Sequence, residues 1–121
     1  MAWQFHNRAP VYLQLVSRIR KDILSGKYKA DEQVPPVRQM AFEAAVNPNT
    51  MQKAFAELER EGLLYVRSTA GRFVTSDEEV FRRAKETMRK EALAHLLHEA
   101  LSLGITKDEI ITFIQQSKEE D

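Results

Sequence analysis

The sequence contains no cysteine, and this absence removes several kinds of chemistry. A chain without thiols cannot form a disulfide framework, use a thiolate nucleophile or bind a metal ion through sulfur. Glycine and proline are also scarce, with four residues of each. No glycine-rich phosphate loop is present, and no serine, histidine and aspartate pattern indicates a nucleophilic triad. We therefore expect neither an enzyme nor a cofactor.

The sequence also lacks a long hydrophobic run. Its N-terminus carries no apolar segment suited to a signal peptide, and no segment is long enough to span a membrane. Hydrophobic residues still make up 43% of the 121 residues, which is enough for one domain with a core and an appendage. We expect a cytoplasmic protein with no membrane partner.

Net charge is absent as well, since 18 Lys+Arg balance 18 Asp+Glu. A neutral chain at first argues against a nucleic-acid partner, but the charges are distributed unevenly. Residues 1–75 contain 11 Lys+Arg and 7 Asp+Glu, a balance of +4, whereas residues 76–121 contain 7 and 11, a balance of −4. This division indicates a basic functional end and an acidic tail.

Three helices are predicted in the basic part. The first lies between Pro10 and Gly26 and has an apolar residue at every fourth position. The second spans about residues 37–45. The third starts at Asn47-Pro48, which supplies a capping side chain and a proline suited to the first turn. The aromatic residues Trp3 and Phe5, with His6, are expected to pack onto this domain or onto a partner.

A strand pair is predicted after the third helix. The strands occupy residues 64–67 and 72–74, around a turn at 68–71, and residues 27–34 form a loop or a short strand. The exposed start of the third helix should offer free amides and positive dipole to a phosphate. A helix start beside a hairpin is typical of a small domain that places one helix in a DNA groove.

The tail predicts two further helices. Ser76 to Glu79 reads as a capping box for a helix that extends to about Leu103, and Thr106 to Glu109 reads as a second box. Their apolar surface cannot be stable alone, so it must cover the first domain or another copy of the chain. The residues expected at a dimer interface are Phe81, Met88, Leu93, Leu96, Leu97 and Leu101.

Several motifs occur in order between residues 10 and 75. They are Pro10-Val11-Tyr12-Leu13-Gln14-Leu15, Val34-Pro35-Pro36-Val37-Arg38, Val46-Asn47-Pro48-Asn49-Thr50 and Leu58-Glu59-Arg60-Glu61-Gly62-Leu63. With these motifs the chain resembles the GntR family of bacterial transcription regulators. The Asn-Pro-Asn-Thr segment and the short C-terminal part resemble its YtrA-like subfamily.

The resemblance implies a mainly α fold with a small β wing. Residues 1–75 would form a winged helix-turn-helix DNA-binding domain, and residues 76–121 a short two-helix dimerisation segment. The resemblance also implies a homodimer that binds a two-fold symmetric operator in double-stranded DNA. It implies, further, that the target is a transporter operon.

The resemblance also implies roles for particular residues. Arg38 matches the arginine that contacts DNA from the start of the second helix. Asn49, Thr50 and Gln52 match positions of the recognition helix that face the groove, and Gly71 matches the glycine at the wing tip.

Three positions depart from the family pattern. Pro48 stands where many members carry a DNA-contacting Arg or Lys, so that contact is absent. Pro36 replaces the usual serine cap of the second helix. Ala45 replaces the usual glycine of the turn, which costs about 1 kcal/mol if its conformation is left-handed.

The side chains of the third helix suit a DNA groove chemically. Amides such as Asn49 and Gln52 pair bidentately with adenine in the major groove, and each good pair discriminates by roughly 1–3 kcal/mol. Thr50 would bond a phosphate through its hydroxyl. Lys53, beside this face, would add a contact that does not depend on sequence.

Arginines would complete the interface. Arg38 would clamp a phosphate or a guanine edge, and Arg72 and Arg67 on the wing would enter the minor groove or hold the backbone. Plainer interpretations remain open for Arg38, as an ion pair with Glu43 or a tail acid, and for Arg72, as a solvated turn charge.

Plainer interpretations also exist for the helical positions. Asn49 and Thr50 are residues that favour caps, so ordinary capping of the third helix would explain them. Lys53 and Arg60 would equally suit a solvated helix face.

The tail also contains residues at a spacing that could suit a metal site. His95, His98 and Glu99 lie on neighbouring turns, with Glu91 one turn back, which is a spacing that metal ligands use. The region otherwise reads as a packing helix without a second ligand cluster, so we expect no metal.

The sequence thus predicts a sequence-specific transcriptional regulator, a repressor that binds a palindromic operator as a homodimer. A small-molecule effector would have to bind at the dimer interface, because the tail is too short to enclose a ligand cavity. The alternative is a winged-helix protein-interaction module without specific DNA binding. DNA binding through several phosphates should weaken steeply with salt, whereas a hydrophobic protein contact should not.

Overall fold

The structure, a computed structural model, describes residues 2–118. It is mainly helical with a small two-stranded sheet, as the sequence predicts. The chain divides into two compact units, one ending at Ala84 and the other beginning at Lys85. This division lies nine residues beyond the predicted boundary at residue 75, because Val80, Phe81 and Ala84 still pack against the core of the first unit.

Helix α1 (Val11–Leu24) begins directly after Pro10, whose carbonyl oxygen accepts hydrogen bonds from the amides of Leu13 and Gln14. The four-residue spacing of its apolar side chains puts them on one side of the helix. Its buried residues are Leu15, Val16, Ile19 and Ile23. Gly26, with φ +95°, lies in the region that favours glycine and ends the helix as predicted.

Helices α2 (Val37–Ala44) and α3 (Pro48–Arg60) are separated by only three residues. The first of these, Ala45, adopts φ 60° and ψ 47°, which is the left-handed conformation. The amide of Val46 then bonds to the carbonyl oxygen of Ala41 at 3.0 Å and closes the turn. A side chain in this conformation costs free energy that glycine would avoid, so the helix-turn-helix is built around a strained alanine.

Helix α3 has the predicted start and buried face. The side chain of Asn47 accepts a hydrogen bond from the amide of Asn49 at 2.7 Å, and Pro48 occupies the first turn. The residues that α3 buries are Met51, Ala54, Phe55 and Leu58.

The wing consists of β1 (Leu64–Val66) and β2 (Arg72–Val74), which pair antiparallel with Tyr65 opposite Phe73. Residues 31–34 run along the other edge of β2. The amide of Val34 bonds to the carbonyl oxygen of Arg72 at 3.0 Å, and that of Val74 bonds to Glu32 at 2.9 Å. The segment predicted as a loop or a short strand therefore adds a third extended segment to the wing.

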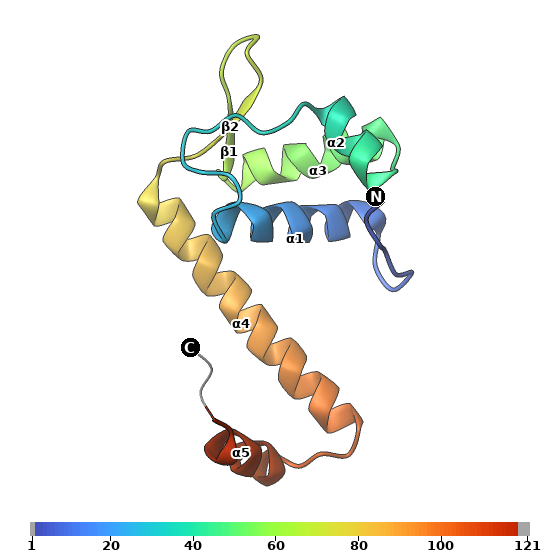
Figure 1. The fold of residues 1–121 in the computed structure, drawn as a ribbon, viewed down its shortest axis with the longest axis vertical. Helices are drawn as coiled ribbons and strands as arrows, with labels where there is room; N and C mark the ends of the chain where they lie inside the picture. Colours follow the sequence, from blue (N-terminus) through green and yellow to red (C-terminus); the bar gives the residue numbers. More distant parts are fainter. Residues whose placement is uncertain (1, 119–121) are drawn as a thin grey trace. The chain divides into compact units, whose positions relative to one another are not determined.

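Within the first unit, α1 and α3 lie side by side and the hairpin projects away from the helices (Figure 1). The core gathers side chains from α1, α2, α3 and the strands, and fully buried Phe55, Leu15 and Met40 are among its largest. Burying one such side chain contributes about 1.5–3 kcal/mol. Trp3 and Phe5 pack against this core, which confirms one of the two placements predicted for them.

Helix α4 (Glu78–Ser102) starts differently from the prediction. Asp77, not Ser76, supplies the cap, because its Oδ1 accepts hydrogen bonds from the amides of Glu79 at 3.0 Å and Val80 at 3.3 Å. The capping box read from Ser76 is therefore wrong by one residue. Asp77 is itself held in place, since its amide donates to the hydroxyl of Thr75 at 3.0 Å.

Helix α5 (Lys107–Gln116) has the predicted capping box. The Thr106 hydroxyl accepts from the amide of Glu109, and the Glu109 carboxylate accepts from the amide of Thr106. Neither α4 nor α5 contains a buried residue. No helix among residues 2–118 combines the length and apolar character needed to cross a membrane.

Substitution Ala45→Gly should stabilise the protein, because glycine adopts the left-handed conformation without a steric penalty. We expect the free energy of unfolding to rise by roughly 0.5–1 kcal/mol, measured by urea denaturation. Ala56→Gly is the matched control, since Ala56 is exposed in the interior of α3 and should lose a similar amount. Equal destabilisation by both substitutions would contradict the strained turn.

Candidate nucleic-acid interface

The outward face of α3 carries two amide side chains. Asn49 and Gln52 are exposed, opposite the buried Met51 and Phe55. Among residues 2–118, no hydrogen bond or ion pair engages either side chain. Residues three apart share one side of a helix, so the two amides are presented together. Their hydrogen-bonding groups remain available for an external partner.

Capping does not account for these residues. Asn47 provides the side-chain cap of α3, and within residues 2–118 the side chains of Asn49 and Thr50 form no capping hydrogen bond. Thr50, which follows Asn49, is half-buried. The plainer interpretation of Asn49 and Thr50 as caps is therefore not what the structure shows.

The amides at the start of α3 are already used, contrary to the sequence-based expectation. Pro48 has no N–H, the amide of Asn49 bonds to the Asn47 side chain, and that of Thr50 bonds to the Asn47 carbonyl oxygen at 3.0 Å. The Asn-Pro pair that makes a good cap consumes the donors that a phosphate would need. This helix end is thus not the amide site that was predicted.

The start of α2 has the opposite character. Pro36 precedes the helix and provides no side-chain cap. Within residues 2–118, the amides of Val37, Arg38 and Gln39 donate no hydrogen bond. Arg38 is exposed and forms no ion pair there, because Glu43 instead accepts a hydrogen bond from Gln39 at 3.2 Å. Unbonded amides and the helix dipole at this end, with an exposed arginine in the first turn, suit the binding of an anion.

Two other basic side chains of α3 are held by neighbours. The Lys53 ammonium lies 3.9 Å from the ring centroid of Tyr12 on α1, although Lys53 remains exposed. Arg60 donates to Glu57, and this hydrogen bond lowers the pKa of the Glu57 carboxyl. Arg60 therefore forms an ion pair with Glu57 within the same helix.

Arg72 is placed differently from the predicted wing-tip charge. Its Nε lies 3.3 Å from Glu59 Oε1, its side chain is 21% exposed, and its guanidinium lies 5.3 Å from the Phe55 ring centroid. Arg72 faces α3 because it alternates along β2 with Phe73, which lies on the other face of the hairpin. The interpretation as a solvated turn charge is wrong, because the side chain lies largely buried against α3, whereas a DNA contact of Arg72 stays a prediction.

Gly71 is constrained by a residue that the sequence did not single out. Its φ is +113°, and a Cβ there would lie 2.8 Å from Nε2 of Gln33. Gln33 Nε2 donates to the carbonyl oxygen of Ala70 at 2.5 Å. No local pattern marks Gln33, since its contact spans 37 residues along the chain.

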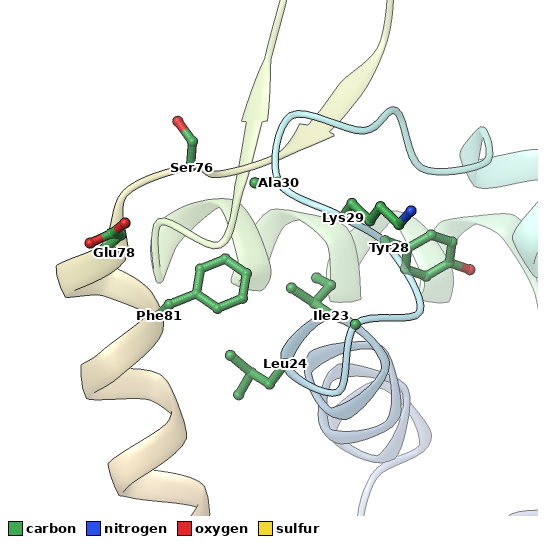
Figure 2. A pocket seen from close by; sticks show the side chains of 9 residues that line it. Ile23, Leu24, Tyr28, Lys29, Ala30, Ser76, Glu78 and Phe81 are labelled. Carbon is green, nitrogen blue, oxygen red and sulfur yellow. The ribbon is translucent and has the colours of Figure 1, made fainter.

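Phe81 was expected at a dimer interface, but in the structure it is half-buried against the core of the first unit. It lines an open groove of about 440 Å³ with Ile23, Leu24 and the loop that contains Tyr28. Figure 2 shows the Phe81 ring pointing toward Ile23 and Leu24. Its apolar surface is therefore partly used within its own unit.

The other five predicted interface residues remain on the surface of α4. Leu93, Leu96, Leu97 and Leu101 are exposed, by 66%, 58%, 39% and 43%, and Met88 is half-exposed. In the same helix, His95 Nε2 lies 3.9 Å from Glu99 Oε2. No group of three or more possible metal ligands gathers within the part of the chain that the structure describes.

These features define the class of protein. A helix-turn-helix with an outward amide face, followed by a β wing, is a winged helix-turn-helix of a DNA-binding transcriptional regulator. Residues 11–74 match the model of the family described as bacterial regulatory proteins, gntR family. The chain belongs to the GntR family, and within it the chain is YtrA-like.

Full-length relatives are also similar. YhcF, an HTH-type transcriptional regulator of Bacillus subtilis, is 33% identical, with 93% of each chain covered. The HTH-type transcriptional repressor YtrA of the same organism is 31% identical, covering 88% of this chain and 83% of its own. These relatives are transcriptional regulators and not enzymes, and neither is this chain an enzyme.

Solved structures agree with the fold. A GntR family transcriptional regulator from Listeria monocytogenes superposes with a TM-score of 0.80 at 31% identity, covering 94% of this chain and 100% of that one. The DNA-binding domain of AraR in complex with an operator gives a TM-score of 0.56 at 28% identity, over 60% of this chain and 93% of that one.

Arg38→Ala should weaken DNA binding without disturbing the fold, because Arg38 is exposed and unpaired at the uncapped start of α2. We expect a loss of roughly 5- to 150-fold in affinity, measured by fluorescence anisotropy with a duplex. Arg60→Ala removes an exposed arginine that is committed to Glu57 and should change affinity far less. Equal effects of the two substitutions would show that only net charge matters at Arg38.

Proposed function

We propose that this regulator is a repressor that binds a palindromic operator as a homodimer in the cytoplasm. The observation that carries the proposal is the pairing of an unengaged amide face on α3 with the unpaired Arg38 on α2. The amides of Asn49 and Gln52 would read adenines in the major groove while Arg38 holds the backbone. Thr50 and Lys53 would add contacts to phosphates.

The name of one relative supports repression. YtrA of Bacillus subtilis is described as a transcriptional repressor. A transporter operon is the target that the YtrA-like resemblance implies, and we propose it as the first place to search for an operator. Occlusion of a promoter by a dimer bound across two half-sites would be sufficient for repression.

Exposed apolar side chains on the tail support the dimer. Leu93, Leu96, Leu97 and Leu101 recur at helical spacing on α4, and α5 exposes Phe113 and Ile114. Amphipathic helices in proteins gain most of their stability from packing, so these surfaces need a partner. A second copy of the chain would supply it and would relate two recognition helices by a two-fold axis. Any small-molecule effector would then act at this interface.

The alternative of a protein-interaction module is disfavoured. Such a module has no need for an outward amide face on α3 or for an unpaired arginine at the start of α2. The operator complexes formed by the AraR domain, a structural neighbour, also favour DNA as the partner.

Selection from a random duplex library at moderate salt tests the proposal. We expect enrichment of a palindrome whose half-sites are about one helical turn, ~34 Å, apart. Repeating the selection with Gln52→Ala should relax the preference at one base pair of each half-site while other positions stay unchanged. No enrichment by a folded protein would contradict specific recognition, and a single half-site would contradict the dimer.

Leu97→Asp should produce monomers, because it places a charge in the proposed apolar interface. Light scattering would report the mass, and anisotropy should show DNA binding weakened by loss of the second half-site. Glu99→Gln, two residues further along α4, changes charge without entering the leucine stripe and should leave the mass unchanged. A Leu97→Asp protein that remains dimeric would place the interface elsewhere.

A further inference from the structure

The wing carries two arginines, one on each side of its turn, and their surroundings differ. Arg72, which opens β2, is mostly buried between Glu59 and Phe55 of α3. The Nε atom of Arg72 is buried from solvent and forms no hydrogen bond of good geometry. Releasing this side chain toward DNA would uncover Phe55 and leave Glu59 unpaired. Arg72 is therefore suited to fastening the wing to α3.

Arg67, just after β1, lies on the opposite face of the hairpin and is exposed. Its guanidinium lies 4.5 Å from the ring centroid of Phe73, and Nη2 donates a hydrogen bond to the Tyr65 hydroxyl at 2.9 Å. Tyr65 and Phe73 stack with centroids 5.8 Å apart, so they form one aromatic surface under the guanidinium. Stacking of this kind orients an arginine while its charge remains accessible.

The Tyr65 hydroxyl has a second role. It donates a hydrogen bond to Oδ1 of Asp31 at 2.8 Å, which leaves its oxygen to accept from Arg67. Asp31 thereby acts on Arg67 only through Tyr65, and no carboxylate within residues 2–118 forms a direct ion pair with Arg67. Since a guanidinium has five N–H donors and one is used, several remain for phosphate or base edges.

The backbone of Arg67 is fixed as firmly as its side chain. Its amide donates to the carbonyl oxygen of Gly71 at 3.0 Å, and its carbonyl oxygen accepts from Ala70 at 2.9 Å. The side chain of Gln33 holds Ala70 from the neighbouring segment at 2.5 Å. These hydrogen bonds close the turn at Arg67, so the side chain of Arg67 extends from a backbone that is held in place.

We propose that Arg67 is the wing residue that contacts DNA, with Tyr65 as its positioning residue, and that Arg72 instead joins the wing to the recognition helix. The sequence instead favours Arg72 as the DNA contact, because Arg72 directly follows the wing-tip glycine, Gly71. The proposal requires only that the winged helix binds DNA and does not depend on the dimer or on the operator's symmetry.

Arg67→Ala and Arg72→Ala form a matched pair that tests the proposal. Both full-length variants are titrated with one duplex of fixed sequence at several salt concentrations, and their thermal unfolding is followed by circular dichroism. Arg67→Ala should lose about tenfold in affinity and lower the slope of log K against log salt by about 1, with an unchanged melting temperature. Arg72→Ala should lower the melting temperature and leave the salt slope unchanged.

Tyr65→Phe tests the positioning role, because it keeps the stack and removes the hydroxyl. Its affinity should fall between those of the wild type and Arg67→Ala while the salt slope is retained, since the arginine charge is still present. Affinity equal to that of the wild type would reject the positioning role of Tyr65.

An unchanged salt slope for Arg67→Ala would overturn the proposal. A slope lowered by about 1 in a folded Arg72→Ala protein would overturn the assignment of Arg72. Failure of Arg72→Ala to fold would support the structural role of Arg72. The salt slope of Arg67→Ala alone would then decide whether Arg67 contacts DNA. If the wild-type protein itself did not bind the duplex, the proposal that the winged helix binds DNA would be wrong, and the roles of Arg67 and Arg72 would not be the cause.

Discussion

The packing of α3 against α1 is the contact on which the rest of the first unit depends. Met51, Phe55 and Leu58 are at most 1% exposed. Because an α-helix repeats every 3.6 residues, burying this side forces Asn49 and Gln52 to face outward. The orientation of the candidate recognition surface therefore follows from the apolar side of the same helix. The wing depends on it too, since Arg72 reaches back to Glu59 and Phe55.

Two prolines determine where an anion would be held. Pro48 follows a capping asparagine, so the amides at the start of α3 are occupied or absent. Pro36 precedes α2 without a side-chain cap, so the amides there remain unbonded next to Arg38. The base contacts and the phosphate contact that we propose would therefore come from different helices. The strained turn at Ala45 joins the end of α2 to the start of α3.

Local signals in the sequence predicted the helices and strands well, because each depends on residues within one or two turns. The caps at Asn47 and Thr106 and the stop at Gly26 are of this kind. The cap of α4 was misplaced since Ser76 and Asp77 are both good caps and the choice depends on the preceding strand. The environments of Arg72, Gln33 and Phe81 were not predictable, because they arise from contacts between segments far apart in the sequence.

Ion pairing within the first unit explains how a chain with no net charge can bind a polyanion. Arg20 pairs with Glu61, Arg60 with Glu57, and Arg72 with Glu59, so three arginines and three glutamates around α3 largely cancel at short range. Screening limits the long-range effect of the remaining acidic residues to about 8–10 Å at ordinary salt. Arg38 and Arg67, which form no ion pair with a carboxylate within residues 2–118, then dominate the potential near their own surfaces. Local pairing, rather than the total charge, decides which arginines remain available to DNA.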